Sequence, residues 1–385
     1  MPALLLFGDT ERSPAMRHEI PVPIGDGLLF AEVDGRTTIL TSWLERERIA
    51  AVLPDAEILD FMELGMRALA EEGMTRLGAQ REVVLRVVRR LGISDAIVPG
   101  DFPVAIADRL RADGITLTVD DESVAARRRV KAGAELAGVR AAQQAAHAAT
   151  ARAAELLAGA EIGPDGNLRG EDGGPLLAEA VREELRRTCA EHGATCPADM
   201  IVASVHNGGG GHDPGSGPLP SGLPIQVDIF PRHEASACWA DMTRTFVAGD
   251  PTPEHAELIS EQERLVRAAL EEARALVRPG VTGRELYEAT CDLFEAAGWA
   301  TQRTGGGGDE GFQFALGHGV GLEVHEPPGL GFAGREPLVA GDVIAIEPGL
   351  WDKRIGGVRL EDLLLVTDDG CETLTEYPYE LTPGA

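Results

Sequence analysis

Two short segments of the chain each place a carboxylate inside an apolar, strand-like run. "LPIQVDIF" contains Asp228, "ACWADMTRTF" contains Asp241, and the polar stretch "PRHEAS" lies between them. The two aspartates are symmetric about a point between Glu234 and Ala235. A hairpin closed at that point would set them roughly opposite each other, with Cβ atoms about 5 Å apart. The sequence therefore predicts a facing pair of aspartates.

A second pair of carboxylates repeats this arrangement downstream. "VIAIEPGLW" places Glu347 at the end of an apolar strand, and "VRLEDLLLV" places Glu361 inside another. Their midpoint is Arg354, within the turn-like sequence "DKRIGG". Facing carboxylates in apolar surroundings are costly unless one keeps its proton or a cation lies between them. One such pair would also fit an edge strand with solvated acids or a protonated dyad, but two mirrored pairs favour a cation site.

Two histidines, His318 and His325, lie seven residues apart in the glycine-rich run "LGHGVGLEVHEPP". The glycines argue against a helix, and a single regular strand would place the two side chains on opposite faces. A surface turn with two unrelated histidines is the alternative. Beside four carboxylates, however, His318 can supply a nitrogen ligand to a site for two divalent ions, and His325 can contact substrate. Two such ions polarise a carbonyl and lower the pKa of a bridging water, which is chemistry for hydrolysing an amide.

The elements that must position these residues form two domains. Residues 1–122 alternate short apolar runs with helical ones, including a hairpin pattern around Asp34-Gly35, and predict a small α/β domain. An Ala-rich helical stretch from Val124 to about Ala160 opens the second domain. There, a long helical pattern is twice followed by an amphipathic one and then by strands. We expect two similar α/β halves, with the site where their strands meet.

The composition limits the classes of partner. The chain has 385 residues and a formal net charge of −28, and so acidic a surface repels phosphate backbones and anionic lipids. Nucleic acid and membranes are therefore excluded as expected partners. The five cysteines are scattered and none forms a CxxC pair, which argues against a disulfide framework or a cysteine-rich zinc site. No run approaches the roughly 20 apolar residues of a membrane span, and "ALLLF" is too short for a signal peptide, so we expect a cytoplasmic protein.

These residues and their contexts resemble the metallopeptidases of the pita-bread fold, which include Xaa-Pro aminopeptidases, prolidases, methionine aminopeptidases and creatinase. The order Asp, Asp, His, Glu, Glu matches the ligand order of that group, in the contexts "DMTRTF", "GHGVGLEVHE", "IEPG" and "VRLED". The resemblance implies an α/β chain with a creatinase/prolidase-like N-terminal domain over residues 1–122 and a pita-bread catalytic domain over residues 123–385. It also implies a homodimer in which the N-terminal domain of one subunit borders the other's site.

The resemblance implies a metal ligand at each of five matching positions. Asp228 would bind one metal, and Asp241 and Glu361 would bridge the two. His318 and Glu347 would complete the second metal. The metals would be two divalent ions, with manganese or cobalt favoured by the oxygen-rich ligands and zinc as an alternative.

The resemblance also implies four further roles, either in the hydrolysis of the peptide or in positioning a metal ligand. Glu347 would also take a proton from the attacking water, and His325 would help to stabilise the tetrahedral intermediate. His212, in "GGGGHDPGSGPL", lies close to where Xaa-Pro peptidases carry a histidine on the substrate side. Arg359, two residues before Glu361, would share its strand face and orient that carboxylate.

The sequence departs from the group's pattern at three places. Asp228 and Asp241 are thirteen residues apart, which is two more than the group leads us to expect. Phe314 stands where many relatives carry a histidine. Gly329 stands where prolidases often carry an arginine that grips a dipeptide carboxylate, with Arg335 nearby but not at the matching place. The expected activity is removal of the N-terminal residue of a peptide whose second residue is proline. A prolidase, a dipeptidase of relaxed proline preference and a non-catalytic peptide-binding module are the alternatives.

Overall fold

The computed structural model of the chain describes residues 2–131, 133–207, 212–305, 308 and 310–384. The chain divides into two compact units, Met1–Arg128 and Arg129–Ala385. The domain limits expected from the sequence, residues 1–122 and 123–385, stay a prediction. Among the helices described, none is long and apolar enough to cross a membrane.

The first unit is built on a six-stranded sheet with the order β4-β3-β2-β1-β5-β6. The predicted hairpin is confirmed, because β2 and β3 pair antiparallel and are joined by Asp34 and Gly35, whose φ angles are 49° and 74°. Alternate residues of the central strands enter two separate apolar cores, so both faces of the sheet are covered. The strands are β1 (Ala3–Gly8), β2 (Leu28–Val33), β3 (Arg36–Thr41), β4 (Glu57–Asp60), β5 (Asp95–Val98) and β6 (Thr116–Val119). The helices are α1 (Pro14–Glu19), α2 (Arg46–Val52), α3 (Met66–Glu71), α4 (Arg76–Arg90), α5 (Val104–Arg111) and α6 (Asp121–Ala126), with a 3₁₀ turn at Trp43–Glu45.

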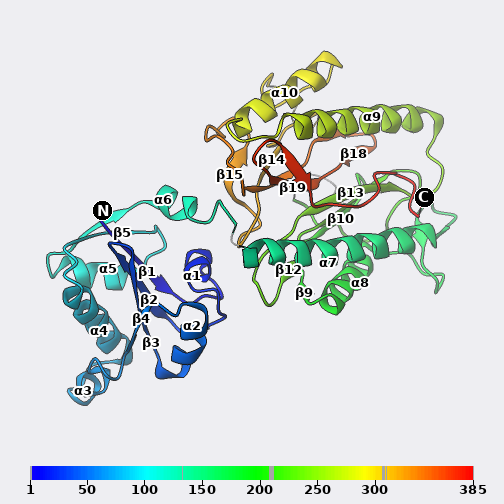
Figure 1. Ribbon diagram of the computed structural model, residues 1–385. Coiled ribbons are helices and arrows are strands. Elements are labelled where there is room, and N and C mark those ends of the chain that lie inside the picture. The colour runs from blue at the N-terminus through cyan, green and yellow to red at the C-terminus, as the bar shows by residue number, and fades with distance from the viewer. Residues whose placement is uncertain (1, 132, 208–211, 306–307, 309, 385) are drawn as a thin grey trace. The chain divides into compact units, whose positions relative to one another are not determined.

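The second unit contains the two long and two amphipathic helices that the sequence predicts. They are α7 (Gly133–Ala158), α8 (Ala178–Glu191), α9 (Pro253–Leu276) and α10 (Gly283–Ala296). The start of α10 is fixed by a capping box, in which Thr282 and Glu285 satisfy each other's backbone N–H groups. Helices α7 and α8 lie on one side of the strands of this unit, and α9 and α10 lie on the other (Figure 1).

The strands of the second unit form two main sheets, one for each pair of helices. One has the order β10-β11-β13 and shares an apolar core with α7 and α8, and the other has the order β15-β14-β16-β19-β20 and shares a core with α9 and α10. Their strands are β10 (Ile201–Ala203), β11 (Pro224–Ile229), β13 (Met242–Val247), β14 (Gly317–Gly319), β15 (Glu326–Leu330), β16 (Val343–Ile346), β19 (Asp362–Val366) and β20 (Cys371–Thr373). Three two-stranded pairs are β7 (Glu161–Ile162) with β8 (Leu168–Arg169), β9 (Ala194–Thr195) with β12 (Arg232–His233), and β17 (Gly349–Asp352) with β18 (Gly356–Arg359).

The first predicted carboxylate hairpin forms with a different register. Asp228 of β11 faces Thr243 of β13, so the expectation that Asp228 and Asp241 stand directly opposite each other is wrong by two residues. The connecting segment explains the shift, because its β12 strand pairs with β9 and Ala237 adopts a φ of 65° in the turn. A shift of two residues leaves every side chain on its original face, whereas a shift of one would not. Both aspartates therefore still reach the same site.

The second predicted hairpin is confirmed in its register. Gly349 pairs with Arg359, and Ile346 pairs with Asp362, so both strand pairs are centred on Arg354. The hairpin is interrupted on each side, since β16 ends before Glu347 and β18 ends at Arg359 before β19 begins. Arg359 and Glu361 thus lie at the ends of successive strands rather than within one.

Candidate metal centre

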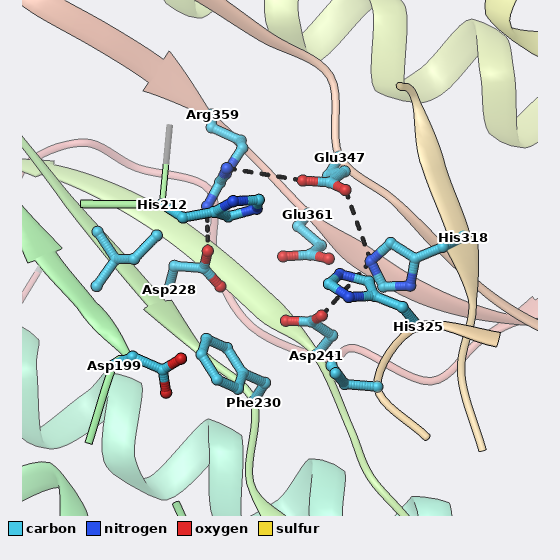
Figure 2. A pocket seen from close by; sticks show the side chains of 12 residues that line it. Asp199, His212, Asp228, Phe230, Asp241, His318, His325, Glu347, Arg359 and Glu361 are labelled. Carbon is cyan, nitrogen blue, oxygen red and sulfur yellow. Dashed lines mark hydrogen bonds and ion pairs between the residues drawn. The ribbon is translucent and has the colours of Figure 1, made fainter. Parts of the chain in front are cut away.

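All the sequence-predicted site residues line one cavity of about 360 Å³ in the second unit. The carboxylates approach it from strand ends: Asp228 lies in β11, and Asp241 directly precedes β13. The remaining residues are His318 of β14, Glu347 and Glu361 beside β16 and β19, Arg359 of β18, and His212 and His325 in loops. Figure 2 shows these side chains converging from opposite sides of the cavity.

Three overlapping groups of donor atoms lie within this cavity, and two of them share Glu361. Oxygens of Asp228, Asp241 and Glu361 lie within 4.8 Å of one another, and so do donor atoms of His318, Glu347 and Glu361. Glu361, which is 1% exposed, belongs to both groups. Among the described residues, Oδ1 of Asp228 and Oδ1 of Asp241 are buried without a hydrogen-bond partner. Buried acceptors without donors are rare in proteins, so this donor set fits divalent cations in the cavity.

Without a cation, the surroundings of these buried carboxylates strongly disfavour ionisation of all of them at once. Burial, together with the neighbouring carboxylates, raises the pKa of Asp241 and of Glu361 well above their usual ranges. Burial also raises the pKa of Glu347 to about 7, although Arg359 opposes this rise. A positive ion among these oxygens would stabilise the charged forms and reverse the shifts.

His318 is oriented to offer a lone pair to the cavity. Its Nδ1 lies 3.1 Å from the carbonyl oxygen of Gly319, which can only accept a hydrogen bond, so Nδ1 carries the proton. Its Nε2 faces Asp241 Oδ2 and Glu347 Oε1, each at 3.6 Å. Burial lowers the pKa of His318 and keeps the ring neutral. This is the geometry of a metal-ligating histidine whose second nitrogen is held by the backbone.

The glycines around His318 allow β14 to lie between its two neighbours. A Cβ atom at Gly317 would stand 1.9 Å from the carbonyl oxygen of Ala345 in β16, and one at Gly319 would stand 2.4 Å from that of Pro327. The part of the run that holds His318 is thus an internal strand, Gly317–Gly319, whereas Gly321–His325 form a bend before the edge strand β15.

His325 lies against His318 but in a different environment. The two rings are perpendicular, with an interplanar angle of 84° and centroids 4.2 Å apart. His325 is exposed as a residue, but partial burial of its ring against His318 lowers its pKa. One of its ring nitrogens also lies within 4.8 Å of donor atoms of Asp241 and His318. Its assignment to substrate rather than metal therefore stays a prediction.

Arg359 connects the carboxylates of the two sheets. Its guanidinium donates to Asp228 and lies 3.7 Å from Glu347 Oε2. The surrounding carboxylates raise the pKa of Arg359 against the opposing effect of burial, so the group stays charged. The predicted effect on Glu361 is indirect, because Arg359 Nε donates to Thr243 Oγ1 and Thr243 donates to Glu361 Oε2 at 2.7 Å.

Sequence reasoning missed two threonines that hold this network. Thr243 orients Glu361, and Thr245 accepts from the Arg359 backbone N–H at 3.0 Å and donates to the Arg359 carbonyl at 2.9 Å. The signal was present in "DMTRTF", because Asp241, Thr243 and Thr245 alternate along one strand and must share a face.

A second cavity of about 720 Å³ adjoins the first. His212, His318, His325, Glu347 and Arg359 line both cavities. The remaining wall of the larger one is mainly apolar or aromatic and includes Phe314, Leu350, Trp351 and Val358. The two cavities together can accommodate groups on both sides of a bond held at the carboxylates.

Known proteins are similar in sequence to this chain. An uncharacterized peptidase of Bacillus subtilis, YqhT, is 35% identical over 214 residues, which cover 54% of this chain and 55% of that protein. A Xaa-Pro dipeptidase of Pyrococcus furiosus is 34% identical over 196 residues, covering 49% and 51% of the two chains. The chain spans about half the length of the curated relatives it matches.

Solved structures match nearly the whole chain. The prolidase from Pyrococcus horikoshii aligns with a TM-score of 0.74 and 23% identity over 99% of this chain and 95% of that one. The X-Pro aminopeptidase from Thermotoga maritima aligns with a TM-score of 0.75 and 21% identity over 99% and 97%. The expected pita-bread fold is thereby confirmed. Residues 137–368 match metallopeptidase family M24, and since this region includes more than half of the chain and all the clustered donors, the chain belongs to that family.

Proposed function

We propose that the protein is a metal-dependent exopeptidase that removes the N-terminal residue of a peptide, preferentially before proline. The observation that carries this proposal is the pair of overlapping donor groups joined by Glu361. Two divalent ions held there, Mn²⁺ by preference and Co²⁺ or Zn²⁺ otherwise, would polarise the scissile carbonyl and lower the pKa of the attacking water. The homodimer and the cytoplasmic location expected from the sequence stay predictions.

Each side chain of the site has a proposed task. Asp228, Asp241, His318, Glu347 and Glu361 would hold the ions. Glu347 would also accept the proton of the attacking water at its carboxylate. Arg359 fixes the positions of Asp228 and Glu347 through its guanidinium.

Two exposed histidines are proposed to act on the peptide. His325 and His212 line both cavities, so each can reach the atoms around a bond held between them. Burial lowers the pKa of His325, so the ring is neutral at neutral pH and its N–H can donate to the oxygen on which negative charge develops.

Removal and return of metal tests this proposal. Exhaustive chelation should abolish hydrolysis of Xaa-Pro peptides, and Mn²⁺ or Co²⁺ should restore it, because four carboxylates cannot align a water without their cations. The measurement is release of the N-terminal residue, with the metal content followed by elemental analysis. Full activity in a protein free of metal would rule out the dinuclear mechanism, and no hydrolysis in the loaded protein would favour the peptide-binding alternative.

A prolidase is the second candidate, and two observations bear on the choice. In its favour, a 34% identical relative is named a Xaa-Pro dipeptidase. Against strict dipeptide selection, Gly329 lines neither of the two cavities and has open space where a Cβ would stand. Arg335 is also absent from the lining of both cavities.

We therefore expect that at least one tripeptide or longer peptide with proline second is cleaved with a kcat/KM comparable to that of the best dipeptide. An arginine–carboxylate pair is a strong and directional contact, and its absence removes one reason to reject longer chains. The measurement compares kcat/KM for Xaa-Pro and Xaa-Pro-Ala with the same first residue. Cleavage of dipeptides alone would contradict this expectation. It would indicate that Arg335 or a partner subunit binds the carboxylate of the dipeptide.

A further inference from the structure

Asp199 brings a further carboxylate to the wall of the smaller cavity, and the proposed hydrolysis gives it no task. It lies in the turn before β10, and it makes no hydrogen bond or ion pair with any residue that the structure describes. Ile201, the first residue of β10, pairs with Asp228 of β11, and Asp199 lies two residues before it. In Figure 2, Asp199 and Phe230 lie on the side of Asp228 away from Arg359.

The smaller cavity is suited to a single residue. An exopeptidase must hold one residue on one side of the bond and the rest of the peptide on the other. The cavity that contains all the carboxylates measures about 360 Å³, and its neighbour measures about 720 Å³. The N-terminal residue, which carries the cationic α-amine, therefore fits the smaller and more acidic cavity, and the remaining chain fits the larger and more apolar one.

The chemistry around Asp199 matches a long basic side chain. Ile201, Phe230 and Val324 supply apolar wall to the same cavity, and Asp199 supplies a negatively charged acceptor. Lysine and arginine side chains have the complementary combination, with an apolar stem and a cationic end. A guanidinium can also pair with a carboxylate through two parallel hydrogen bonds.

We propose that Asp199 makes this site select peptides whose N-terminal residue is basic, arginine before lysine. The inference rests on the proposed function, which places the N-terminal residue at this site. Asp199 is then a specificity residue: it contacts the side chain of the substrate and takes no part in the bond cleavage itself.

The test compares Arg-Pro-Ala with citrulline-Pro-Ala, because citrulline has the shape of arginine without its charge. For the Mn²⁺-loaded protein, kcat/KM should be about two- to fivefold higher for the arginine peptide, as expected for one partly solvated ion pair. The ratio should fall as salt screens the pair. In Asp199→Asn it should approach one, whereas Glu234→Gln, an exposed acid outside the cavity, should leave it unchanged.

Two kinetic outcomes would overturn the inference. One is a ratio near one in the unsubstituted protein. The other is an equal loss for both peptides in Asp199→Asn, since that would make Asp199 a partner of the α-amine or a structural residue.

A binding measurement separates failure of this inference from failure of the proposed function. Calorimetric titration of the Mn²⁺-loaded protein with free arginine and free citrulline should show the same preference and the same loss in Asp199→Asn. If no peptide is cleaved but arginine is preferred, the proposed function fails and the inference stands. If peptides are cleaved without preference for arginine, the function stands and the inference is wrong. If no peptide is cleaved and arginine is not preferred over citrulline, the proposed function and the inference are both wrong.

Discussion

His318→Ala and His325→Ala should lose activity in different ways. His318→Ala removes the ring whose Nδ1 is held by the Gly319 carbonyl and whose Nε2 faces the carboxylates, so metal content and activity should fall together. His325→Ala leaves the five proposed ligands in place, so it should keep near-normal metal content. It should nevertheless lose about 10²–10³ in kcat, which is the usual cost of removing one donor to a developing oxyanion.

The measurement is metal stoichiometry and steady-state kinetics on the purified variants, with circular dichroism as the check of folding. His212→Ala serves as a companion, because His212 lines both cavities without belonging to any of the donor groups. It should resemble His325→Ala, with a larger effect on KM. Loss of metal in His325→Ala as severe as in His318→Ala would make His325 a ligand, which its position within 4.8 Å of Asp241 and His318 allows geometrically.

The sequence predicted which side chains would meet because a carboxylate inside an apolar strand is costly to bury without a cation or a proton. Glu347 and Glu361 line the same cavity, since the strand pairs on either side of them keep a register centred on Arg354. Asp228 and Asp241 line that cavity too, although the pairing expected between them is wrong. Their connection contains β12, whose pairing with β9 depends on a segment more than thirty residues upstream and is invisible in the local pattern.

The features that the sequence did not predict depend on contacts between segments far apart in the chain. Thr243 reaches Glu361 across 118 residues, and Arg359 reaches Asp228 across 131. The alternation of Asp241 with Thr243 indicates a shared face, but not which carboxylate that face would meet. Asp199 carries no local signal at all, because an aspartate in the turn sequence "CPADM" is ordinary. It lines the cavity because β10, which begins two residues later, pairs with β11 at Asp228.

Arg359→Met should strongly destabilise the metal-free protein at pH 8 and much less at pH 5. Arg359 donates to Asp228 and lies beside Glu347, with its side chain 9% exposed. Removing one partner from a buried ion pair costs about 3–5 kcal/mol of unfolding free energy, because the other charge is left buried and uncompensated. The measurement is urea unfolding in chelator at the two pH values. Arg354→Met is the matched control, because this arginine also pairs with an aspartate but is 52% exposed, and it should change little at either pH.

The pH dependence follows from the direction of the pKa shifts. Burial raises the pKa of Glu347 to about 7, from an unfolded value near 4.5, so its contribution to stability is fully present below pH 4.5 and is lost as the pH rises through 7. The pKa values of Asp241 and Glu361 are raised in the same direction, and Arg359 opposes all three shifts. Without Arg359 these pKa values rise further, so stability should fall more steeply with pH. Arg359→Lys should recover part of the loss by restoring the charge, and Mn²⁺ should recover part in Arg359→Met by supplying a cation to the same oxygens. An equal loss at pH 5 and pH 8, or no recovery with metal, would mean that Arg359 stabilises the protein by packing rather than by balancing the charge of the carboxylates.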